Sequence, residues 1–286
     1  MVIFYGGNSQ NDFVTKIGVY IASLLKVVPS LNRITGAIQS IKFSQSSIER
    51  MISINFNIRE NFNSLSLQFK EGFCLDHITF FYKPGEIIFD DLSLSIPKNS
   101  VIGIIGRSGV GKSTLINIML GNLFPSSGSV KIDDIKLTKN NYSSWQSKIG
   151  YVSQKIHLLD EPIVNNIAFG IPNEKININK VKKVMELAQI SSIEDHFDIL
   201  NDNIGEDGNK LSGGQIQRLG LSRALYTDPD ILFFDEFTSA LDDKTEQKIL
   251  KDIEKLKENK TIILVSHKES VLKFCDQILD LDKTRT

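Results

Sequence analysis

Cysteine is scarce in this sequence of 286 residues, which contains only Cys74 and Cys275. The two lie far apart and form no C-x-x-C spacing, so we expect no cysteine metal site and a reducing compartment. The formal net charge of -1 gives no indication of nucleic acid or of an anionic surface as a partner. Hydrophobic residues make up 41% and charged residues 23%, which is ordinary for a globular protein and argues against wholesale disorder.

Long apolar runs are missing as well. The best run, residues 17–25, lies between Lys16 and Lys26 and falls far short of the roughly 18 to 20 apolar residues of a membrane-spanning helix. Residues 1–5 lack the basic start and the cleavage site of a signal peptide. On these grounds alone, the chain is expected to be soluble.

Residues 13 to about 54 carry a helical pattern. Apolar residues recur at spacings of three and four, from Ile17 and Tyr20 to Ile38 and Ile41. Pro29 is expected to kink this helix or to split it into two. The periodicity leaves two interpretations open: a helix packed on its own domain, or a long helix made for a partner or a membrane boundary.

Residues 55–72 are polar, rich in Asn and Ser, and typical of a linker, and the secondary-structure pattern changes after them. Short β-rich runs then alternate with helical ones, which predicts a parallel α/β core with an antiparallel β piece at its start. Two late strands are almost entirely apolar, as strands covered on both faces should be. Strands are expected at residues 73–79, 87–96, 101–105, 130–132, 149–153, 231–234 and 261–265, and helices at 113–120, 177–190, 213–226 and 243–258.

A glycine loop with the pattern G-x-x-x-x-G-K-[ST] follows the strand at 101–105 and precedes a helix. Its glycines let backbone N–H groups converge on phosphate oxygens, and the helix N-terminus adds partial positive charge. Lys112 is expected to reach the β- and γ-phosphates, Ser113 to ligate Mg²⁺, and Thr114 to add a hydroxyl. A glycine turn without a ligand is the weaker interpretation, because the strand and helix match the motif's context. The loop comprises Gly106, Arg107, Ser108, Gly109, Val110, Gly111, Lys112 and Ser113.

The apolar strand at 231–234 ends in two carboxylates, Asp235 and Glu236. Asp235 fits the role of holding Mg²⁺, directly or through water. Glu236 is expected to point the other way along the strand and to polarise a water as general base. Alone, the pair would be interpreted as a solvated strand end, but the phosphate loop upstream favours the catalytic interpretation.

Between these two motifs lie Leu211, Ser212, Gly213, Gly214 and Gln215. With the motifs in this order, residues 73–286 resemble the nucleotide-binding domain of ATP-binding cassette (ABC) proteins, whose signature this segment matches without substitution. The resemblance implies an α/β P-loop NTPase fold: an ABC-type ATPase core with an antiparallel β subdomain and a helical signature subdomain. It also implies that residues 212–215 complete the ATP site of a second subunit, so that two domains clamp two ATP molecules. Ser212 is a good N-cap for the helix that such a role requires.

Further positions resemble the family one by one. Tyr82 matches the aromatic residue that stacks on adenine, Gln154 the glutamine that contacts Mg²⁺, and His267 the switch histidine that binds the γ-phosphate. Residues 239–242 match the D-loop, which crosses the dimer and ends in Asp242. The implied catalytic residues are Glu236, His267 and Gln154; the implied metal ligands are Ser113, Gln154 and Asp235. His77, His157 and His196 match no motif and are expected to be structural or surface residues.

Three segments resemble exporters in particular. Residues 204–208 resemble the x-loop that touches the coupling helices of the membrane domain, and residues 165–170 are also exporter-like. Residues 28–34 resemble the end of the last transmembrane helix of a half-transporter, most closely that of lipid-linked oligosaccharide flippases. On this basis the resemblance implies that residues 1–54 are the last part of a membrane domain, in which residues 1–5 are the tail of the preceding transmembrane helix and residues 6–12 an external turn. Residues 55–72 are then the linker, and 73–286 are the nucleotide-binding domain on the cytoplasmic side of the cell membrane.

The resemblance therefore implies an ATPase that couples ATP and Mg²⁺ to export. Its expected partners are a second nucleotide-binding domain, in a homodimer or a paired half-transporter, and a transmembrane domain, with no nucleic acid. Two alternatives stay open: a soluble ABC ATPase working on ribosomes or DNA, and a truncated remnant that binds ATP without transport. Most helices of a half-transporter are absent, so a fragment, a split gene product and a separate ATPase subunit are all consistent. The sequence departs from the family at Phe237, where a small residue is usual, and at residues 161–162.

Overall fold

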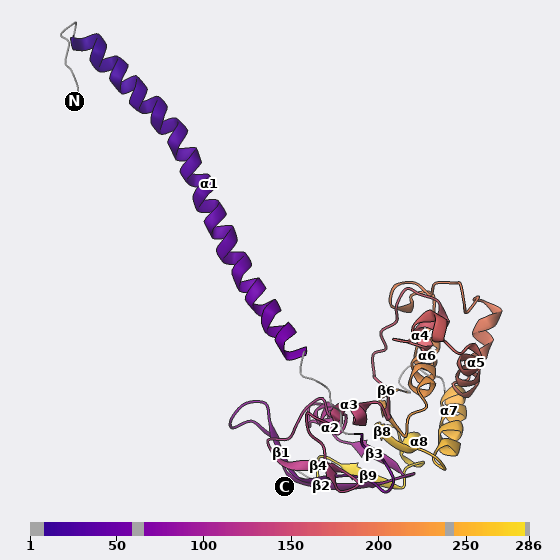
Figure 1. Ribbon diagram of the computed structural model, residues 1–286. Coiled ribbons are helices and arrows are strands. Elements are labelled where there is room, and N and C mark those ends of the chain that lie inside the picture. Colours follow the sequence, from indigo (N-terminus) through magenta and orange to yellow (C-terminus); the bar gives the residue numbers. More distant parts are fainter. Residues whose placement is uncertain (1–8, 59–65, 238–242, 284–286) are drawn as a thin grey trace. The chain divides into compact units, whose positions relative to one another are not determined.

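A computed structural model of the chain describes residues 9–58, 66–237 and 243–283. The chain divides into two compact units, Met1–Phe62 and Asn63–Thr286. Figure 1 shows one long helix in the first unit and sheets with surrounding helices in the second.

The described part of the first unit is the helix α1, Ser9–Ile58. Of the two outcomes expected at Pro29, a kink or a split into two helices, the split does not occur, because α1 continues through this residue. A proline removes one backbone donor, and the turns on both sides keep theirs, so a long helix can pass it. Residues 9–12 also belong to α1, which corrects the external turn predicted over 6–12. Residues 1–8, including the predicted helix tail, lie outside the described part of the chain.

The side chains of α1 are exposed from residue 13 to residue 52. By length and composition, the segment Phe13–Ile52 is long and apolar enough to cross a membrane. The expectation of a soluble chain rested on the length of uninterrupted apolar runs and did not identify this candidate span. In α1 the apolar residues are spread over many turns and separated by small and polar residues, so a search for one run misses them.

The second unit contains two sheets. An antiparallel sheet has the strand order β2-β1-β4-β5, and a parallel sheet has the order β6-β7-β8-β3-β9. The first consists of β1 (Gly72–Phe81), β2 (Ile87–Pro97), β4 (Ser127–Ile132) and β5 (Ile135–Lys136); the second of β3 (Val101–Ile105), β6 (Ile149–Val152), β7 (Ile231–Asp235), β8 (Thr261–Val265) and β9 (Gln277–Asp280). The predicted parallel α/β core with an antiparallel β piece is thereby confirmed.

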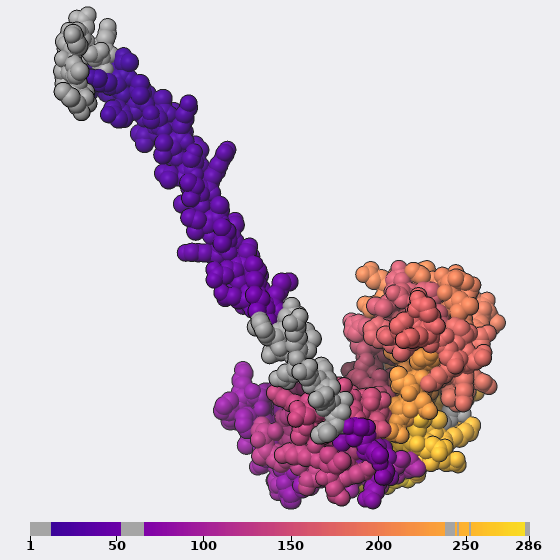
Figure 2. All heavy atoms as spheres, viewed as in Figure 1, coloured from indigo at the N-terminus to yellow at the C-terminus, as the bar shows by residue number. Residues whose placement is uncertain are grey.

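Helices connect and cover these strands. Figure 2 shows the pink-to-orange residues of α4 to α6 gathered in a lobe of the second unit. This lobe is the predicted helical signature subdomain. The helices are α2 (Lys112–Met119), α3 (Tyr142–Gln146), α4 (Ile163–Ile167), α5 (Ile178–Leu187), α6 (Gly213–Tyr226), α7 (Asp243–Leu256) and α8 (Glu269–Leu272), with 3-10 turns at Asn173–Lys175, Ser191–Asp195 and Glu206–Gly208.

Two apolar clusters form the core of the second unit. One fills the helical lobe and one face of the parallel sheet, and the other lies between the two sheets around α2. Trp145 is fully buried in the second cluster, and its indole Nε1 donates to the carbonyl of Met119 at 2.7 Å. Because a buried indole N–H needs an acceptor, this hydrogen bond fixes α3 against the end of α2.

The structure differs from the predicted linker at both of its ends. Helix α1 continues to Ile58, and the polar stretch ends before Leu67 and Phe69, whose side chains are buried in the second cluster. The ring of Phe69 packs edge-on against Trp145, with centroids 5.9 Å apart. The alternation of the buried residues Leu67 and Phe69 is too short to be recognised as a sequence pattern in a segment dominated by Asn and Ser. Of the predicted linker, residues 59–65 lie outside the described residues.

Candidate active site

The glycine loop joins β3 to α2 and curls its backbone around an open space. Gly109 has φ 79°, and a Cβ at this position would meet no atom within 4 Å, so the loop is open on this side. Gly111, the N-cap of α2, has φ 111°, and a Cβ there would lie 2.8 Å from Cγ2 of Ile88. Only glycine adopts these angles without strain, which explains the residue type at both positions. The backbone N–H groups at the start of α2 therefore face a cradle suited to an anion.

Lys112 crosses the inside of this loop. Its ammonium donates to the carbonyl oxygens of Gly106 at 2.6 Å and Arg107 at 3.2 Å, and lies 3.1 Å from Nε2 of His267. The loop thus holds a cation directly over its own carbonyl groups. A phosphate in the cradle would meet this ammonium and the N–H groups of α2 together.

Glu236 lies between two other predicted site residues. Its Oε2 accepts a hydrogen bond from Nε2 of Gln154 at 2.7 Å, and its Oε1 lies 3.6 Å from Nε2 of His267. Strand alternation is not the reason for this position, because β7 ends at Asp235 and Glu236 has φ 48°. The left-handed backbone turns the Glu236 carboxylate out of the strand direction. Three predicted catalytic residues are therefore brought together by a turn rather than by a strand.

Asp235, at the end of β7, is held by a residue that the sequence interpretation missed. The hydroxyl of Tyr151, on the neighbouring strand β6, donates to Oδ2 of Asp235 at 3.3 Å. Burial raises the pKa of Asp235 above its usual range, and the charge of Glu236 adds to this effect while the Tyr151 hydrogen bond opposes it. Burial, with the nearby Asp235 carboxylate, raises the pKa of Tyr151 to about 12. A half-buried carboxylate of this kind gains from a cation bound beside it.

One pocket of about 400 Å³ collects these groups. It combines the glycine loop, the hydroxyls at the start of α2, an amide and two carboxylates. Ile88 is the one lining residue that was not predicted, and it packs beside Gly111. The lining residues are Tyr82, Ile88, Ser108, Gly109, Gly111, Lys112, Ser113, Thr114, Gln154, Asp235 and Glu236.

Tyr82 lies at the rim of the pocket with 59% of its surface exposed. Its hydroxyl is 3.2 Å from Oγ1 of Thr114, and its ring meets Phe80 edge-on with centroids 5.0 Å apart. These contacts fix the ring while leaving it accessible. An exposed, fixed aromatic ring is suited to stacking on a planar ligand.

The signature residues do not line this pocket. They begin α6, where the Ser212 hydroxyl accepts from the N–H of Gln215 at 3.3 Å and the Gln215 Oε1 accepts from the N–H of Ser212 at 2.8 Å. This reciprocal capping box satisfies two donors at the start of the helix and makes Gln215 part of the cap. The N–H groups of Gly213 and Gly214 lie in the same first turn. The arrangement offers a second helix N-terminus that can face an anion.

Comparison with known families matches residues 89–239 to a family described as ABC transporter. The chain belongs to the ABC transporter family. A protein named ATP-dependent lipid A-core flippase from Ralstonia nicotianae is 34% identical over 210 residues, covering 72% of this chain and 36% of that protein. A putative export ATP-binding/permease protein of Rickettsia typhi is 33% identical over 256 residues, covering 86% and 43%. The solved structure of a bacterial Atm1-family ABC exporter with ATP bound matches with a TM-score of 0.74 at 29% identity, covering 84% of this chain and 43% of that one.

These matches confirm the predicted family and its nucleotide-binding domain of exporter type. The chain spans 36% and 43% of the lengths of the two curated relatives described. Helix α1 and the nucleotide-binding domain therefore correspond in extent to less than half of such a protein.

Three residues of the glycine loop, residues 106–113, do not line the pocket. Gly106 contributes its carbonyl to Lys112, and Val110 is buried in the core cluster between the sheets. Arg107 turns away: its Nε and its backbone N–H donate to the carboxylate of Asp282 at 3.1 and 3.0 Å. The Arg107 hydrogen bond holds the pKa of Asp282 below its usual range. These three residues therefore support the loop without lining the pocket.

The departure at Phe237 is accommodated in the core. Phe237 is buried and packs on Phe234 with ring centroids 4.6 Å apart. The large side chain thus extends the apolar cluster and leaves the pocket unobstructed. Asp242 and the rest of the predicted D-loop, residues 239–242, lie outside the described residues.

In the helical lobe, residues 204–208 contact the part of segment 154–170 that leads into the other exporter-like stretch, residues 165–170. The carboxylate of Asp160 accepts from the N–H of Gly205 at 2.8 Å, and Pro162 forms a β-bridge with Asn203. His157, which matched no motif, lies 3.4 Å from the Asp207 carboxylate at the surface. Segments 154–170 and 204–208 therefore form one structural patch.

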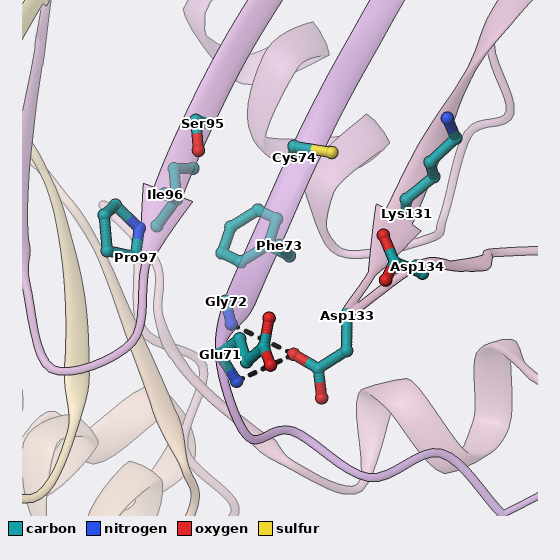
Figure 3. Close-up of a pocket in the computed structure, with 10 residues that line it drawn as sticks. All are labelled: Glu71, Gly72, Phe73, Cys74, Ser95, Ile96, Pro97, Lys131, Asp133 and Asp134. Carbon is teal, nitrogen blue, oxygen red and sulfur yellow. Dashed lines mark hydrogen bonds between the residues drawn. The ribbon is translucent and has the colours of Figure 1, made fainter.

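A second pocket, of about 270 Å³, lies on the antiparallel sheet (Figure 3). Its main polar group is Asp133, whose carboxylate accepts hydrogen bonds from the N–H groups of Lys70, Glu71 and Gly72 at 2.7, 2.9 and 3.0 Å. The carboxylate is thus used by the backbone that leads into β1. We interpret this pocket as structural.

Proposed function

We propose that this chain is the ATP-hydrolysing nucleotide-binding domain of an ABC exporter, with α1 as the last part of the membrane domain. The observation that carries the proposal is the position of Glu236. Its carboxylate is held between Gln154 and His267 at a pocket that also contains the glycine loop and Lys112. This arrangement combines a general base with a phosphate cradle.

In the proposed reaction, the N–H groups of the loop and the Lys112 ammonium bind the phosphates of ATP. Glu236 accepts a proton from the attacking water, and Gln154 and His267 orient the Glu236 carboxylate and the γ-phosphate. Tyr82 stacks on the adenine ring at the pocket rim. The bond broken is the one between the γ-phosphorus and the bridging oxygen, so the products are ADP and inorganic phosphate.

The chain's own residues fit a magnesium ion. Ser113, Gln154 and Asp235 place a hydroxyl, an amide and a carboxylate oxygen along the same pocket, and Mg²⁺ prefers oxygen ligands. Burial raises the pKa of Asp235, and a cation beside this carboxylate would favour its ionised form. When bound, Mg²⁺ supplies charge neutralisation at the phosphate oxygens.

A second nucleotide-binding domain is part of the proposal. Ser212 and its neighbours begin α6 outside the pocket of their own chain, so the helix N-terminus is available to the γ-phosphate of another. The second domain belongs to another copy of the chain or to a paired half-transporter. Asp242 would cross between the two.

Coupling to the membrane is proposed to use the patch formed by segments 154–170 and 204–208. Phe169, within this patch, is 58% exposed although it is a large apolar residue. Contiguous exposed apolar patches mark surfaces that meet other proteins, and Phe169 contributes one such side chain to the proposed coupling surface. With α1 in the membrane, the nucleotide-binding domain would lie on the cytoplasmic side.

The proposed cargo is a lipid-linked oligosaccharide. Two observations support it: the pattern of residues 28–34, and a relative named for lipid A-core flipping.

The test is phosphate release by the full chain and by Glu236→Gln. We expect the variant to bind ATP like the wild type and to lose turnover by roughly 10²- to 10⁴-fold, the usual effect of a general base. Glu254→Gln, at an exposed position of α7, is the matched control and should keep full activity. Turnover that survives in Glu236→Gln would refute the assignment.

A further inference from the structure

Glu246 is a buried carboxylate outside the nucleotide pocket. It lies in the first turn of α7, and its side chain is only 4% exposed. It does not line the pocket. A carboxylate is rarely buried unless strong donors compensate for its lost hydration, so its partners indicate what it holds in place.

These partners come from the segment that follows β8. Lys268 forms an ion pair with Oε2 of Glu246, and the Ser270 hydroxyl donates to Oε1 at 2.7 Å. The two ends of the carboxylate thus bind two side chains of one short segment. Since 22 residues separate Glu246 from Lys268, the contact joins two elements that are distant in the sequence.

His267 lies directly beside this contact. Its neighbour Lys268 donates its backbone N–H to the Ser266 hydroxyl at 3.1 Å, and Ser266 is itself buried at the end of β8. The backbone on both sides of His267 is therefore fixed, by β8 before it and by Glu246 after it. The imidazole then extends to 3.1 Å from the Lys112 ammonium and 3.6 Å from the Glu236 carboxylate.

We infer that Glu246 is a positioning residue for ATP hydrolysis, which holds the loop after β8 so that His267 faces Glu236. The inference rests on the proposed ATPase function. Glu246 acts through Lys268 and Ser270, and it contacts no reacting atom. Its loss would let the imidazole move relative to Glu236, and displacements of about 1 Å strongly affect reaction rates.

The variant Glu246→Gln tests this in the full chain. It keeps an oxygen for Ser270 but removes the charge that pairs with Lys268. We expect kcat to fall about 10- to 100-fold while the KM for ATP stays within about twofold, since the loop and Lys112 are unchanged. Lys257→Met is the matched control, because it breaks the ion pair with Asp276 beyond the other end of α7. The control should keep the wild-type kcat.

A second readout follows His267 itself. The chain has four histidines, so their imidazole nitrogen resonances can be resolved by NMR and that of His267 identified by its loss in His267→Ala. We expect the His267 resonances to shift in Glu246→Gln and to stay in place in Lys257→Met. If Glu246→Gln does not fold, Lys268→Met removes the same ion pair from its half-exposed side and takes its place in both measurements.

Unchanged His267 resonances in a folded variant would overturn the inference, whether or not kcat falls. A wild-type kcat would also overturn it. A wild-type chain without ATP hydrolysis would instead count against the proposed function, and the resonances would still test the positioning role.

Discussion

The position of the Glu236 carboxylate is determined by the backbone conformation of this residue. Its φ of 48° is in the left-handed region, which costs a non-glycine residue about 1 kcal/mol or more. The backbone N–H compensates in part by donating to the carbonyl of Val265 at 3.0 Å. The strain is thus held by the pairing of β7 with β8, and it presents the carboxylate to Gln154 and His267.

The Lys112 ammonium donates to two backbone carbonyl oxygens, which phosphate oxygens of bound ATP would replace as acceptors. The carbonyl oxygens of Gly106 and Arg107 hold the ammonium in the loop, and phosphate oxygens are stronger acceptors for it. We therefore predict that Lys112→Ala weakens ATP binding by about 10- to 100-fold, the effect of losing a hydrogen bond to a charged group. Titration with a fluorescent ATP analogue measures the change.

The control for this prediction is Lys139→Ala, which removes an exposed lysine that does not line the pocket. It should leave the affinity unchanged. An unchanged affinity in Lys112→Ala would remove the glycine loop from the binding site.

Among the elements, those of the parallel core could be predicted from the sequence most accurately. The strands at 101–105 and 261–265 and the helix at 213–226 coincide with β3, β8 and α6. Fully buried strands form short apolar runs, and α6 starts at a capping box, so local residues determine both signals. Strand β9 was missed because Gln277 and Ile278 are exposed at the sheet edge, where no apolar run forms.

The short helices α3, α4 and α8 have only four or five residues each, too few to display a helical period. In the site, the loop motif indicated five of the residues that line the pocket, because these residues are neighbours in sequence. Tyr151 could not be predicted in the same way. Its contact with Asp235 exists only because β6 pairs with β7.

Asp133 fastens the backbone that leads into β1 (Figure 3). Burial alone would raise its pKa, but hydrogen bonds from the N–H groups of Gly72, Glu71 and Lys70 hold the pKa below the ordinary value of 3.8. A depressed pKa means that the ionised form contributes stability above pH 3.8, and that this contribution is lost as the pH falls through the folded-state pKa.

We therefore predict that Asp133→Asn lowers the thermal midpoint at neutral pH by about 3 °C. The difference from wild type should narrow as the pH falls from about 4 through the folded-state pKa, below which the wild-type carboxylate is protonated in the folded chain too. Calorimetry across this pH range tests the prediction. Asp134→Asn, the exposed neighbour in the same pocket, should match the wild type throughout. A constant difference at every pH would contradict the role of the ionised carboxylate.

On the scale of the whole molecule, the nucleotide pocket and the signature residues lie at different places in the second unit. The pocket contains the glycine loop and Glu236, the proposed general base, whereas the signature residues begin α6 outside it. The capping box shows that the signature helix is already formed and capped in a single chain. Our account therefore requires a second nucleotide-binding domain to bring such a helix to the pocket.

The most direct measurement is the mass of the Glu236→Gln chain by light scattering in detergent, with and without ATP and Mg²⁺. The account predicts that ATP doubles the protein mass, since two pockets close over nucleotide that cannot be hydrolysed. It also predicts that Ser212→Arg in the same background stays at the mass of one chain, because the added side chain fills the start of α6. A doubling that persists in Ser212→Arg, or a mass that ATP leaves unchanged in Glu236→Gln, would contradict the claim that the signature of one chain completes the site of another.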